Sequence, residues 1–540
     1  MTLAVLSALW IAVFANWPLW RALLALPETN SFRGALFVVG LGVMIAALIT
    51  ALLALAAWGF SIKPMIILFV LAAAFGAHFM GTYGIVIDST MMINVVQTDP
   101  REVRDLLSPR LVLSVLFLAG VPLLLMWRAR LQRLGMLAQL GRNTLGLVMA
   151  LSVLVALVFA LFADLSTTMR NNKSLRYLIN PLNSFYALAD LGLRANAKPG
   201  GPPWVIGADA RIAPRAAGTR PPLVLLMVGE TARSDHFALN GYARPTNPEL
   251  SALDLVSFRE VSSCGTNTAT SLPCMFSHLG KARFEARERD SENLLDLVQR
   301  AGMAVLWLDN QAGCKGLCEH VPNAHAIDAA PGNAAPPVPI CQDGECLDEA
   351  LLIGLDSRLA ALPADKRERG VLLVLHQMGS HGPAYFKRSP PSRKPFMPEC
   401  STNVLQQCDR ASLINAYDNS IAYTDHVLAQ TVLWLNGQSA NFETAMLYVS
   451  DHGESLGDNN LYLHGLPYAL APREQTHVPM VLWLGPRAQG DANSQTACLR
   501  AQRDLALTHD NLFHSVLGLL GIRAGEYKPG LDAFAACRVP

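Results

Sequence analysis

Five long apolar stretches without a charged residue occupy the first third of this chain. They run over Met1–Trp20, Gly34–Ile62, Pro64–Ile87, Leu111–Trp127 and Thr144–Ala163. Each supplies about 17 to 25 apolar residues, the length a helix needs to cross the hydrocarbon core of a bilayer. Buried core helices are a poor alternative, because five such stretches follow one another so closely. The first stretch lacks the basic start of a cleaved signal peptide. The sequence therefore predicts a five-span membrane domain over residues 1–164.

The charged loops between these stretches predict the orientation. The loop between the fourth and fifth stretches contains Arg128, Arg130, Arg133 and Arg142 and no acidic residue. Basic loops stay on the cytoplasmic side, so this loop is expected to be inside. The loop between the third and fourth stretches is rich in acids and suits the outer side. Everything after residue 164 is then expected outside the cell membrane.

Cysteine usage supports the same orientation, because all ten cysteines lie after residue 263. Disulfides form in oxidising compartments, so the C-terminal part is expected to fold outside the cytoplasm. Cys264 and Cys274 bracket a short segment rich in hydroxyl groups, which a disulfide could close. Cys314 and Cys318 flank Lys315, and no further pair completes a metal site there, so a disulfide is favoured. The formal net charge of +1 argues against nucleic acid as a partner.

Beyond the membrane domain, composition predicts a bridge and a soluble domain. Residues 165–221 are amphipathic and then rich in proline and glycine, typical of bridging helices and a linker. From residue 222 to 540, short apolar runs alternate with helical segments. The expected strands are Leu223–Val228, Met303–Leu308, Val371–Leu375, Ala445–Val449 and Pro479–Leu484, and the expected helices include Glu292–Arg300, Ala411–Leu435 and Asp510–Gly521. This alternation predicts an α/β domain with a doubly wound, mostly parallel sheet.

Polar side chains follow the ends of these strands. They are Glu230, Asp309, Asn310, His376, Asp451 and His452. In open α/β sheets, ligands bind at the carboxyl ends of the strands. Glu230, Asp451 and His452 suit a metal ion, and a hydroxyl from the loop after Cys264 could complete a tetrahedral zinc site. Taken singly the signals are weak, because Glu230 could cap a helix and Asp451-His452-Gly453 could be an ordinary loop.

The histidines divide into two groups. His236, His278, His320 and His325 are interpreted as ordinary surface or core residues. His376, His381 and His464 lie beside predicted strand ends, in His-Gln-Met-Gly-Ser-His-Gly-Pro and Leu-Tyr-Leu-His-Gly. They are the histidines expected to take part in chemistry.

Several motifs resemble those of one family. They are Val-Gly-Glu230-Thr-Ala-Arg, Asn240-Gly-Tyr, Cys264-Gly-Thr-Asn-Thr268-Ala, Pro273-Cys-Met-Phe-Ser, His376-Gln-Met-Gly-Ser-His381-Gly-Pro and Ser450-Asp-His-Gly-Glu-Ser-Leu-Gly. Together they resemble the lipid A phosphoethanolamine transferases, which include the mobile colistin-resistance enzymes and belong to the alkaline phosphatase/sulfatase superfamily. The resemblance extends over essentially the whole chain.

The resemblance implies roles for individual residues. Thr268 is the implied nucleophile. The implied zinc ligands are Glu230, Thr268, Asp451 and His452. The residues implied to bind substrate are His381, His464, Lys315 and His376 at the phosphoryl group, and Asn94, Thr98 and Glu102 near the lipid. Pro100 interrupts the last three, so they are not expected to share one helical face. The family's disulfides imply the pairs Cys264–Cys274, Cys314–Cys318, Cys341–Cys346, Cys400–Cys408 and Cys498–Cys537.

The implied activity is transfer of phosphoethanolamine from phosphatidylethanolamine to a phosphate of lipid A through a phospho-threonine intermediate. Such a chain would be a monomer in the inner membrane of a Gram-negative bacterium, with its catalytic domain in the periplasm. It would carry one tightly bound zinc ion, and whether a second zinc ion binds during turnover is left open. Its activity would protect the cell against polymyxins and other cationic peptides. The alternative acceptor is a core-oligosaccharide sugar or another glycan. A membrane-bound phosphodiesterase or sulfatase and a catalytically inactive scaffold are less favoured, because the spans and all implied metal ligands are present.

Overall fold

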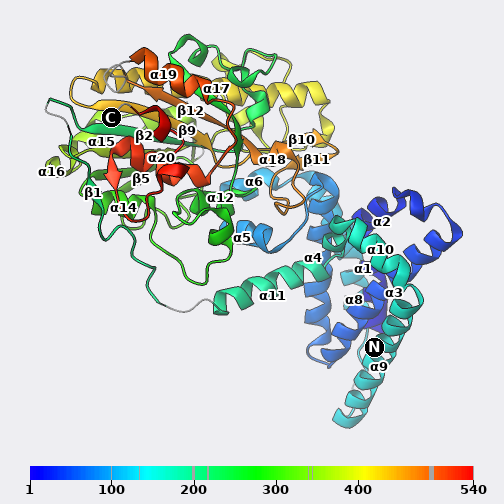
Figure 1. The fold of residues 1–540 in the computed structure, drawn as a ribbon. Coiled ribbons are helices and arrows are strands. Elements are labelled where there is room, and N and C mark those ends of the chain that lie inside the picture. Colours follow the sequence, from blue (N-terminus) through cyan, green and yellow to red (C-terminus); the bar gives the residue numbers. More distant parts are fainter. Residues whose placement is uncertain are drawn as a thin grey trace. The chain divides into compact units, whose positions relative to one another are not determined.

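The computed structural model describes residues 1–98, 100–132, 134–197, 201–215, 218–337, 340–342, 344–485 and 492–538. The chain forms two compact units (Figure 1). The N-terminal unit consists of Met1–Val95 and Leu107–Ala195, and the C-terminal unit consists of Val96–Leu106 and Asn196–Pro540. The short segment Val96–Leu106 therefore packs with residues that lie far beyond it in sequence.

The N-terminal unit contains helices long and apolar enough to cross a bilayer. Four qualify individually: α3 (Phe32–Leu55), α4 (Ile62–Tyr83), the continuous helix Pro109–Arg128 that comprises α7, η2 and α8, and α9 (Met136–Ala160). A fifth span is formed if α1 (Thr2–Phe14) and α2 (Trp17–Leu24), bent by 46° at their junction, cross together. Asn16 precedes α2, and Pro18 lies in the first turn of that helix. Backbone N–H groups of a first turn have no intrahelical acceptor, so the missing N–H of proline costs no hydrogen bond there. The first predicted span is thus a broken helix.

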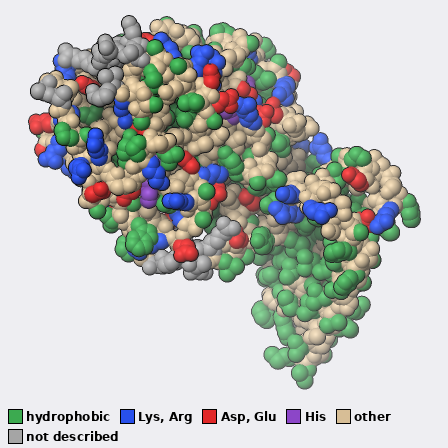
Figure 2. Space-filling model, viewed as in Figure 1, with side chains coloured by type: hydrophobic (Ala, Val, Ile, Leu, Met, Phe, Trp, Pro, Cys, Tyr) green, Lys and Arg blue, Asp and Glu red, His purple; other side chains and the backbone are tan. Residues whose placement is uncertain are grey.

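The surface of this unit is apolar. Figure 2 shows hydrophobic side chains gathered over the lower part of this unit and charged ones on its upper part, and Phe32, Trp127 and Phe159 are among the large apolar residues that are mostly exposed. A soluble protein rarely exposes so continuous an apolar surface, whereas lipid tails satisfy it. Apolar residues of α1, α3 and α4, both small ones such as Ala8 and large ones such as Phe37, fill the interior. The unit has the pattern expected of a membrane-embedded helical domain.

Shorter helices flank the spans. α5 (Ser89–Gln97) and α6 (Pro100–Leu106) form the acidic loop predicted to lie outside, and the helical path breaks before Pro100 as its ring requires. α10 (Phe162–Asn171) and α11 (Leu182–Ala197) occupy the stretch predicted to bridge the two domains. Asn94 and Thr98 therefore do not lie on one continuous helix.

A sheet of eight described strands forms the centre of the C-terminal unit, in the order β13-β3-β12-β9-β2-β8-β4-β5. The strands are β2 (Pro222–Gly229), β3 (Leu255–Ser262), β4 (Ala304–Asp309), β5 (Asn323–His325), β8 (Val371–His376), β9 (Glu443–Ser450), β12 (His477–Leu484) and β13 (Leu507–Thr508). All five predicted strands are present. β3, β5 and β13 were not predicted from the sequence.

Of these eight strands β12 alone runs against its neighbours, β9 and β3. The sheet is therefore mostly parallel, as predicted, and the predicted strand Pro479–Leu484 is its antiparallel member. The chain leaves β9 at the carboxyl edge of the sheet, and between there and β12 it forms only the short hairpin of β10 (Ser455–Asp458) and β11 (Leu461–Leu463) and the one-turn helix α18 (Arg473–Thr476). Without a crossover to the opposite edge, the next strand must run antiparallel.

Helices cover both faces of the sheet (Figure 1). One apolar cluster joins Leu226 and Leu447 of the sheet to α12 (Thr268–Met275), α14 (Leu294–Arg300) and α20 (Asp510–Leu520). A second cluster joins the opposite sheet face to α15 (Leu355–Ala360) and the long α17 (Arg410–Gln438). In a sheet covered on both faces, ligands bind at the carboxyl ends of the strands.

Candidate active site

Two neighbouring strands bring the acidic residues together. β2 and β9 are parallel, with Gly229 opposite Ser450, so Glu230 and Asp451 leave the sheet side by side. His452 follows directly. Ligand atoms of Glu230, Asp451 and His452 all lie within 4.8 Å of one another, and the three residues are fully buried. Parallel register thus brings Glu230 beside Asp451 and His452, which follow it by more than 200 residues in sequence.

Thr268 lies at the same place because of the loop after β3. Asn267 caps α12 by accepting a hydrogen bond from the backbone N–H of Thr270, so Thr268 is the first residue of that helix. Its hydroxyl oxygen lies 3.2 and 3.1 Å from the two carboxylate oxygens of Glu230 and 3.4 Å from Nε2 of His452. The positive end of the helix dipole favours an anion at this point. The hydroxyl is therefore surrounded by groups that can accept its proton.

The hydrogen bonding of His452 determines which nitrogen faces the cluster. Its Nδ1 lies 2.9 Å from the carbonyl oxygen of Gly453, which can only accept, so Nδ1 carries the proton and Nε2 faces Glu230 at 3.3 Å. Burial and the carboxylate of Asp451 raise the pKa of Glu230. Burial disfavours the imidazolium of His452, but the two carboxylates outweigh this and raise its pKa to about 10.

These groups fit a divalent metal ion. The Oδ2 atom of Asp451 is buried and accepts no hydrogen bond from the residues that the structure describes. Two buried carboxylates side by side repel each other unless a cation or protons lie between them. Two carboxylates, one imidazole nitrogen and one hydroxyl oxygen are a donor set suited to tetrahedral coordination.

His376 lies behind this cluster. It is fully buried, and its Nε2 is 4.0 Å from Oε2 of Glu230 while its Nδ1 is 3.2 Å from Oδ2 of Asp309. The Asp309–His376 pair thus contacts the cluster through Glu230. That His376 also binds substrate stays a prediction.

A second group of histidines lies on the other side of His452. The ring centres of His464 and His452 are 4.4 Å apart, and those of His464 and His381 are 5.6 Å apart. Glu454, which the sequence analysis did not single out, lies 3.3 Å from Nδ1 of His464. Burial and neighbouring positive groups lower the pKa of both His381 and His464 well below the ordinary value. Two neutral imidazoles therefore border the site.

The loop that carries His381 is fixed by a buried carboxylate. Asp348 accepts hydrogen bonds from the backbone N–H groups of Met378, at 2.8 Å, and Gly379, at 2.9 Å. Gly379 has a φ of 54°, and a Cβ there would lie 2.6 Å from the carbonyl oxygen of Glu230. Only glycine permits this close approach. Asp348 was missed because nothing in a single sequence distinguishes it from a surface acid.

The remaining predicted residues are divided between the two units. Lys315 is half-buried, lies close enough to His381 to lower the pKa of that residue, and donates to the carbonyl oxygen of Gln97 at 3.3 Å. Thr98 belongs to the C-terminal unit and Asn94 to the N-terminal unit. The side chain of Glu102 lies outside the described part of the chain.

All ten cysteines are paired in the structure. The pairs are Cys264–Cys274, Cys314–Cys318, Cys341–Cys346, Cys400–Cys408 and Cys498–Cys537. These are the pairs that the family resemblance implies. The first one closes the loop that presents Thr268, and the second encloses Lys315.

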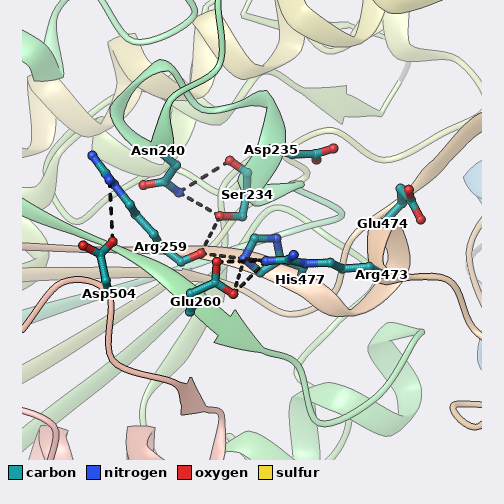
Figure 3. A pocket seen from close by; sticks show the side chains of 9 residues that line it. All are labelled: Ser234, Asp235, Asn240, Arg259, Glu260, Arg473, Glu474, His477 and Asp504. Atoms are coloured by element: carbon teal, nitrogen blue, oxygen red, sulfur yellow. Dashed lines mark hydrogen bonds and ion pairs between the residues drawn. The ribbon is translucent and has the colours of Figure 1, made fainter.

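A cavity of about 440 Å³ lies elsewhere on the C-terminal unit (Figure 3). Its charged side chains largely satisfy one another: Arg473 pairs with Glu260 at 2.7 Å, and Arg259 lies 3.6 Å from Asp504. None of the predicted site residues lines it. The chemistry described above is therefore separate from this cavity.

Comparison with known proteins gives matches over both units. A family model described as "Phosphoethanolamine transferase EptA/EptB" matches residues 45–194, and one described as "Sulfatase" matches residues 222–522. The chain is 39% identical over 544 residues to "Phosphoethanolamine transferase EptA" of Salmonella typhimurium, covering 99% of this chain and 96% of the relative. It is 38% identical to "Phosphatidylethanolamine transferase Mcr-1" of Escherichia coli, covering 90% of this chain and 88% of the relative.

Among solved structures, the chain is similar to the integral membrane lipooligosaccharide phosphoethanolamine transferase A of Neisseria meningitidis. The TM-score is 0.93 at 33% identity, and the match covers 100% of this chain and 99% of the other. The similarity thus includes the membrane helices as well as the α/β unit.

Proposed function

This chain belongs to the phosphoethanolamine transferase family, and on that premise we propose that it transfers phosphoethanolamine from phosphatidylethanolamine to a phosphate group of lipid A. The observation that carries the proposal is the buried cluster in which the hydroxyl of Thr268 lies 3.1 Å from Glu230 and 3.4 Å from His452. A nucleophilic hydroxyl needs a nearby group that favours loss of its proton. The cluster provides such groups at the end of a helix that attracts phosphate.

The protein is a membrane-bound transferase of the inner membrane, with four to five apolar helices before a periplasmic α/β domain. We propose that the membrane domain comprises residues 1–164, the bridge residues 165–221 and the catalytic domain residues 222–540. Both proposed substrates are lipids, so a tether to the membrane keeps the reactive threonine near them. The proposed nucleophile and metal ligands all come from one chain, which supports action as a monomer.

We further propose zinc as the metal, held by Glu230, Thr268, Asp451 and His452. Zinc favours the combination of carboxylate, imidazole and oxygen ligands, and when bound it lowers the pKa of a coordinated hydroxyl. Asp451 has a buried oxygen that is available for such an ion. His452 directs Nε2 toward the same point, because its Nδ1 is hydrogen-bonded to the carbonyl oxygen of Gly453.

The reaction then proceeds in two steps. The hydroxyl oxygen of Thr268 loses its proton and attacks the phosphorus of the donor, and the bond to the diacylglycerol oxygen breaks as that oxygen takes up a proton. Phosphoethanolamine is left on Thr268. A phosphate oxygen of lipid A then attacks the same phosphorus, and the threonine oxygen leaves. His381, His464 and Lys315 border the site and donate hydrogen bonds to the phosphoryl oxygens as charge builds on them.

The test is mass spectrometry of lipid A from a Gram-negative host that expresses the full chain. Wild type is expected to add one or two phosphoethanolamine groups, and Thr268→Ala none. Thr270→Ala, two residues further along the same helix, is the matched control and is expected to retain the modification. Unmodified lipid A in the presence of phosphoethanolamine on core sugars would replace the proposed acceptor, and modification by Thr268→Ala would overturn the nucleophile.

Metal dependence has its own measurement. Purified wild-type protein is expected to contain about one zinc per chain by elemental analysis, and Glu230→Gln much less. A full zinc content in Glu230→Gln would exclude this residue as a ligand. Protection of the host against polymyxin is expected to follow the lipid A modification in every variant.

A further inference from the structure

One buried arginine connects three segments of the C-terminal unit. Arg388 lies seven positions after His381 and is 7% exposed. Its Nε donates to the carbonyl oxygen of His381 at 2.9 Å. One terminal nitrogen lies 3.3 Å from Oε2 of Glu345, and the other lies 3.2 Å from Oδ2 of Asp105. All three nitrogens of the guanidinium group are thus engaged, each by a different segment.

Asp105 is the partner that comes from far away in sequence. It lies near the end of α6, is 5% exposed, and uses its second carboxylate oxygen to pair with Lys387. Its backbone carbonyl oxygen accepts a hydrogen bond from Asn403. One carboxylate therefore holds two cations, and its backbone is held separately. The contacts of Asp105 are made with residues 387, 388 and 403, which all follow His381.

The other end of the same segment is also attached beside the site. Lys315 donates to the carbonyl oxygen of Gln97 at 3.3 Å, and the same amino group bonds the carbonyl oxygen of Ala312 at 3.1 Å. The segment Val96–Leu106 is therefore fixed at its start by Lys315 and near its end by Arg388. Thr98 lies between these two attachments.

The geometry of Arg388 couples these contacts. A guanidinium group is planar and rigid, so displacement of one hydrogen-bonded partner rotates the whole group and disturbs its hydrogen bonds to the other partners. A buried charge that loses its partner is costly, which favours movement of the whole group toward water. Loss of Asp105 is therefore expected to shift both the segment Val96–Leu106 and the backbone at His381.

We propose that Asp105 is a positioning residue, which acts through Arg388 to fix the segment Val96–Leu106 against the loop that carries His381. This inference rests on the proposed function, since it makes that segment a wall of the site that receives the lipid phosphate. The segment Val96–Leu106 and the loop that carries His381 then move together. The proposed zinc ligands follow the ends of β2 and β9 or begin α12, and none of the contacts described here is made with them.

The test measures phosphoethanolamine transfer by the full chain in mixed micelles, with fluorescent phosphatidylethanolamine at varied mole fraction. Asp105→Ala is expected to lower kcat/KM for this donor by about 10- to 100-fold, since small displacements in a reacting site have effects of this size. Zinc content is expected to stay at the wild-type value, whereas the thermal unfolding midpoint is expected to fall, because Arg388 loses one partner of a buried ion pair. Asp105→Glu, which keeps the charge, is expected to recover part of the loss.

A double-mutant cycle distinguishes positioning from a general structural role. If Asp105 acts through Arg388, the double variant Asp105→Ala/Arg388→Lys is expected to be no less active than Arg388→Lys alone. Asp290→Asn removes an acid from the exposed pair with Arg287 and is the matched control, with unchanged activity expected. Independent, multiplying losses in the double variant, or full activity in Asp105→Ala, would overturn the proposal. An inactive wild type would instead count against the proposed function.

Discussion

Replacement of Asp309 by asparagine tests whether residues behind the cluster control metal binding. Asp309 accepts four hydrogen bonds: from the backbone N–H groups of Gln311 at 2.9 Å and Gly313 at 3.1 Å, from Nε1 of Trp307 at 2.9 Å, and from Nδ1 of His376 at 3.2 Å. Each carboxylate oxygen receives two of them. An asparagine must place its NH₂ group against one of these donor pairs.

The cost follows from this donor count. Whichever way the amide turns, at least one buried N–H loses its acceptor, which costs about 1 to 3 kcal/mol of folding free energy. In either orientation His376 loses the negative charge of its acceptor, and with the NH₂ group turned toward it His376 also loses the hydrogen bond that orients its ring behind Glu230. Removal of such an outer partner typically lowers metal affinity by about 10- to 100-fold, which corresponds to about 1.4 to 2.8 kcal/mol.

The assay is a zinc titration of the detergent-purified full chain in competition with a fluorescent chelator. Asp309→Asn is expected to weaken zinc binding by that factor and to lower the thermal midpoint in parallel. Asp425→Asn is the matched control, because Asp425 is also a buried carboxylate that accepts two backbone N–H groups, from Glu249 and Leu250. It is expected to alter stability and leave zinc affinity unchanged.

Zinc affinity within about twofold of wild type in Asp309→Asn would refute this reasoning, given that a tenfold loss is the smallest effect expected of an orienting partner. It would mean that Glu230 keeps its orientation without the Asp309–His376 pair. An equal loss of affinity in Asp425→Asn would show that the assay reports general destabilisation.

Three further outcomes are expected. Gly379→Ala places a Cβ 2.6 Å from the carbonyl oxygen of Glu230, at a residue whose φ is 54°. The resulting strain of about 1 to 2 kcal/mol is expected to displace the loop and to lower transfer activity at least tenfold. Wild-type activity of this variant would contradict the expectation. Asn267→Ala removes the cap of α12, so the free energy of unfolding, measured by chemical denaturation, should fall by about 1 kcal/mol. Because Thr268 is the next residue, kcat, measured from initial rates, should fall as well. Burial raises the pKa of Asp425 to about 7 from 3.8, so the folded state binds this proton more tightly than the unfolded state. The contribution of Asp425 to the free energy of unfolding is then fully present below pH 4 and is lost as the pH rises to 7. A plot of the thermal midpoint of Asp425→Asn against pH should lack that decline. A plot that matches the wild type would exclude Asp425 as the source of the decline.

Local pattern was sufficient for much of the fold. Runs of uncharged residues predicted the membrane helices, because crossing a bilayer demands a length of apolar sequence that few other structures need. Buried strands such as β2 and β8 were predicted because strands covered on both faces are continuously apolar. β5 and β13 were not predicted, since strands of three and two residues leave too short a pattern.

The direction of β12 required the structure. Its apolar run is equally compatible with either direction, and direction depends on where the preceding chain crosses the sheet. The placement of His376 likewise required the structure, because its motif does not reveal that this fully buried side chain lies between Glu230 and Asp309.

The sequence by itself determined the membrane spans, the compartment of the cysteines and, through its motifs, the candidate residues Glu230, Thr268, Asp451 and His452. These depend on composition or on short contiguous segments, which a single chain displays directly. Only the tertiary structure decided that Asp309 contacts His376, that Asp348 holds the backbone before His381, and that Arg388 joins this backbone to Asp105. Those residues act through contacts between distant segments, and an acid or arginine that will be buried by such contacts has the same local sequence signal as one that stays in water.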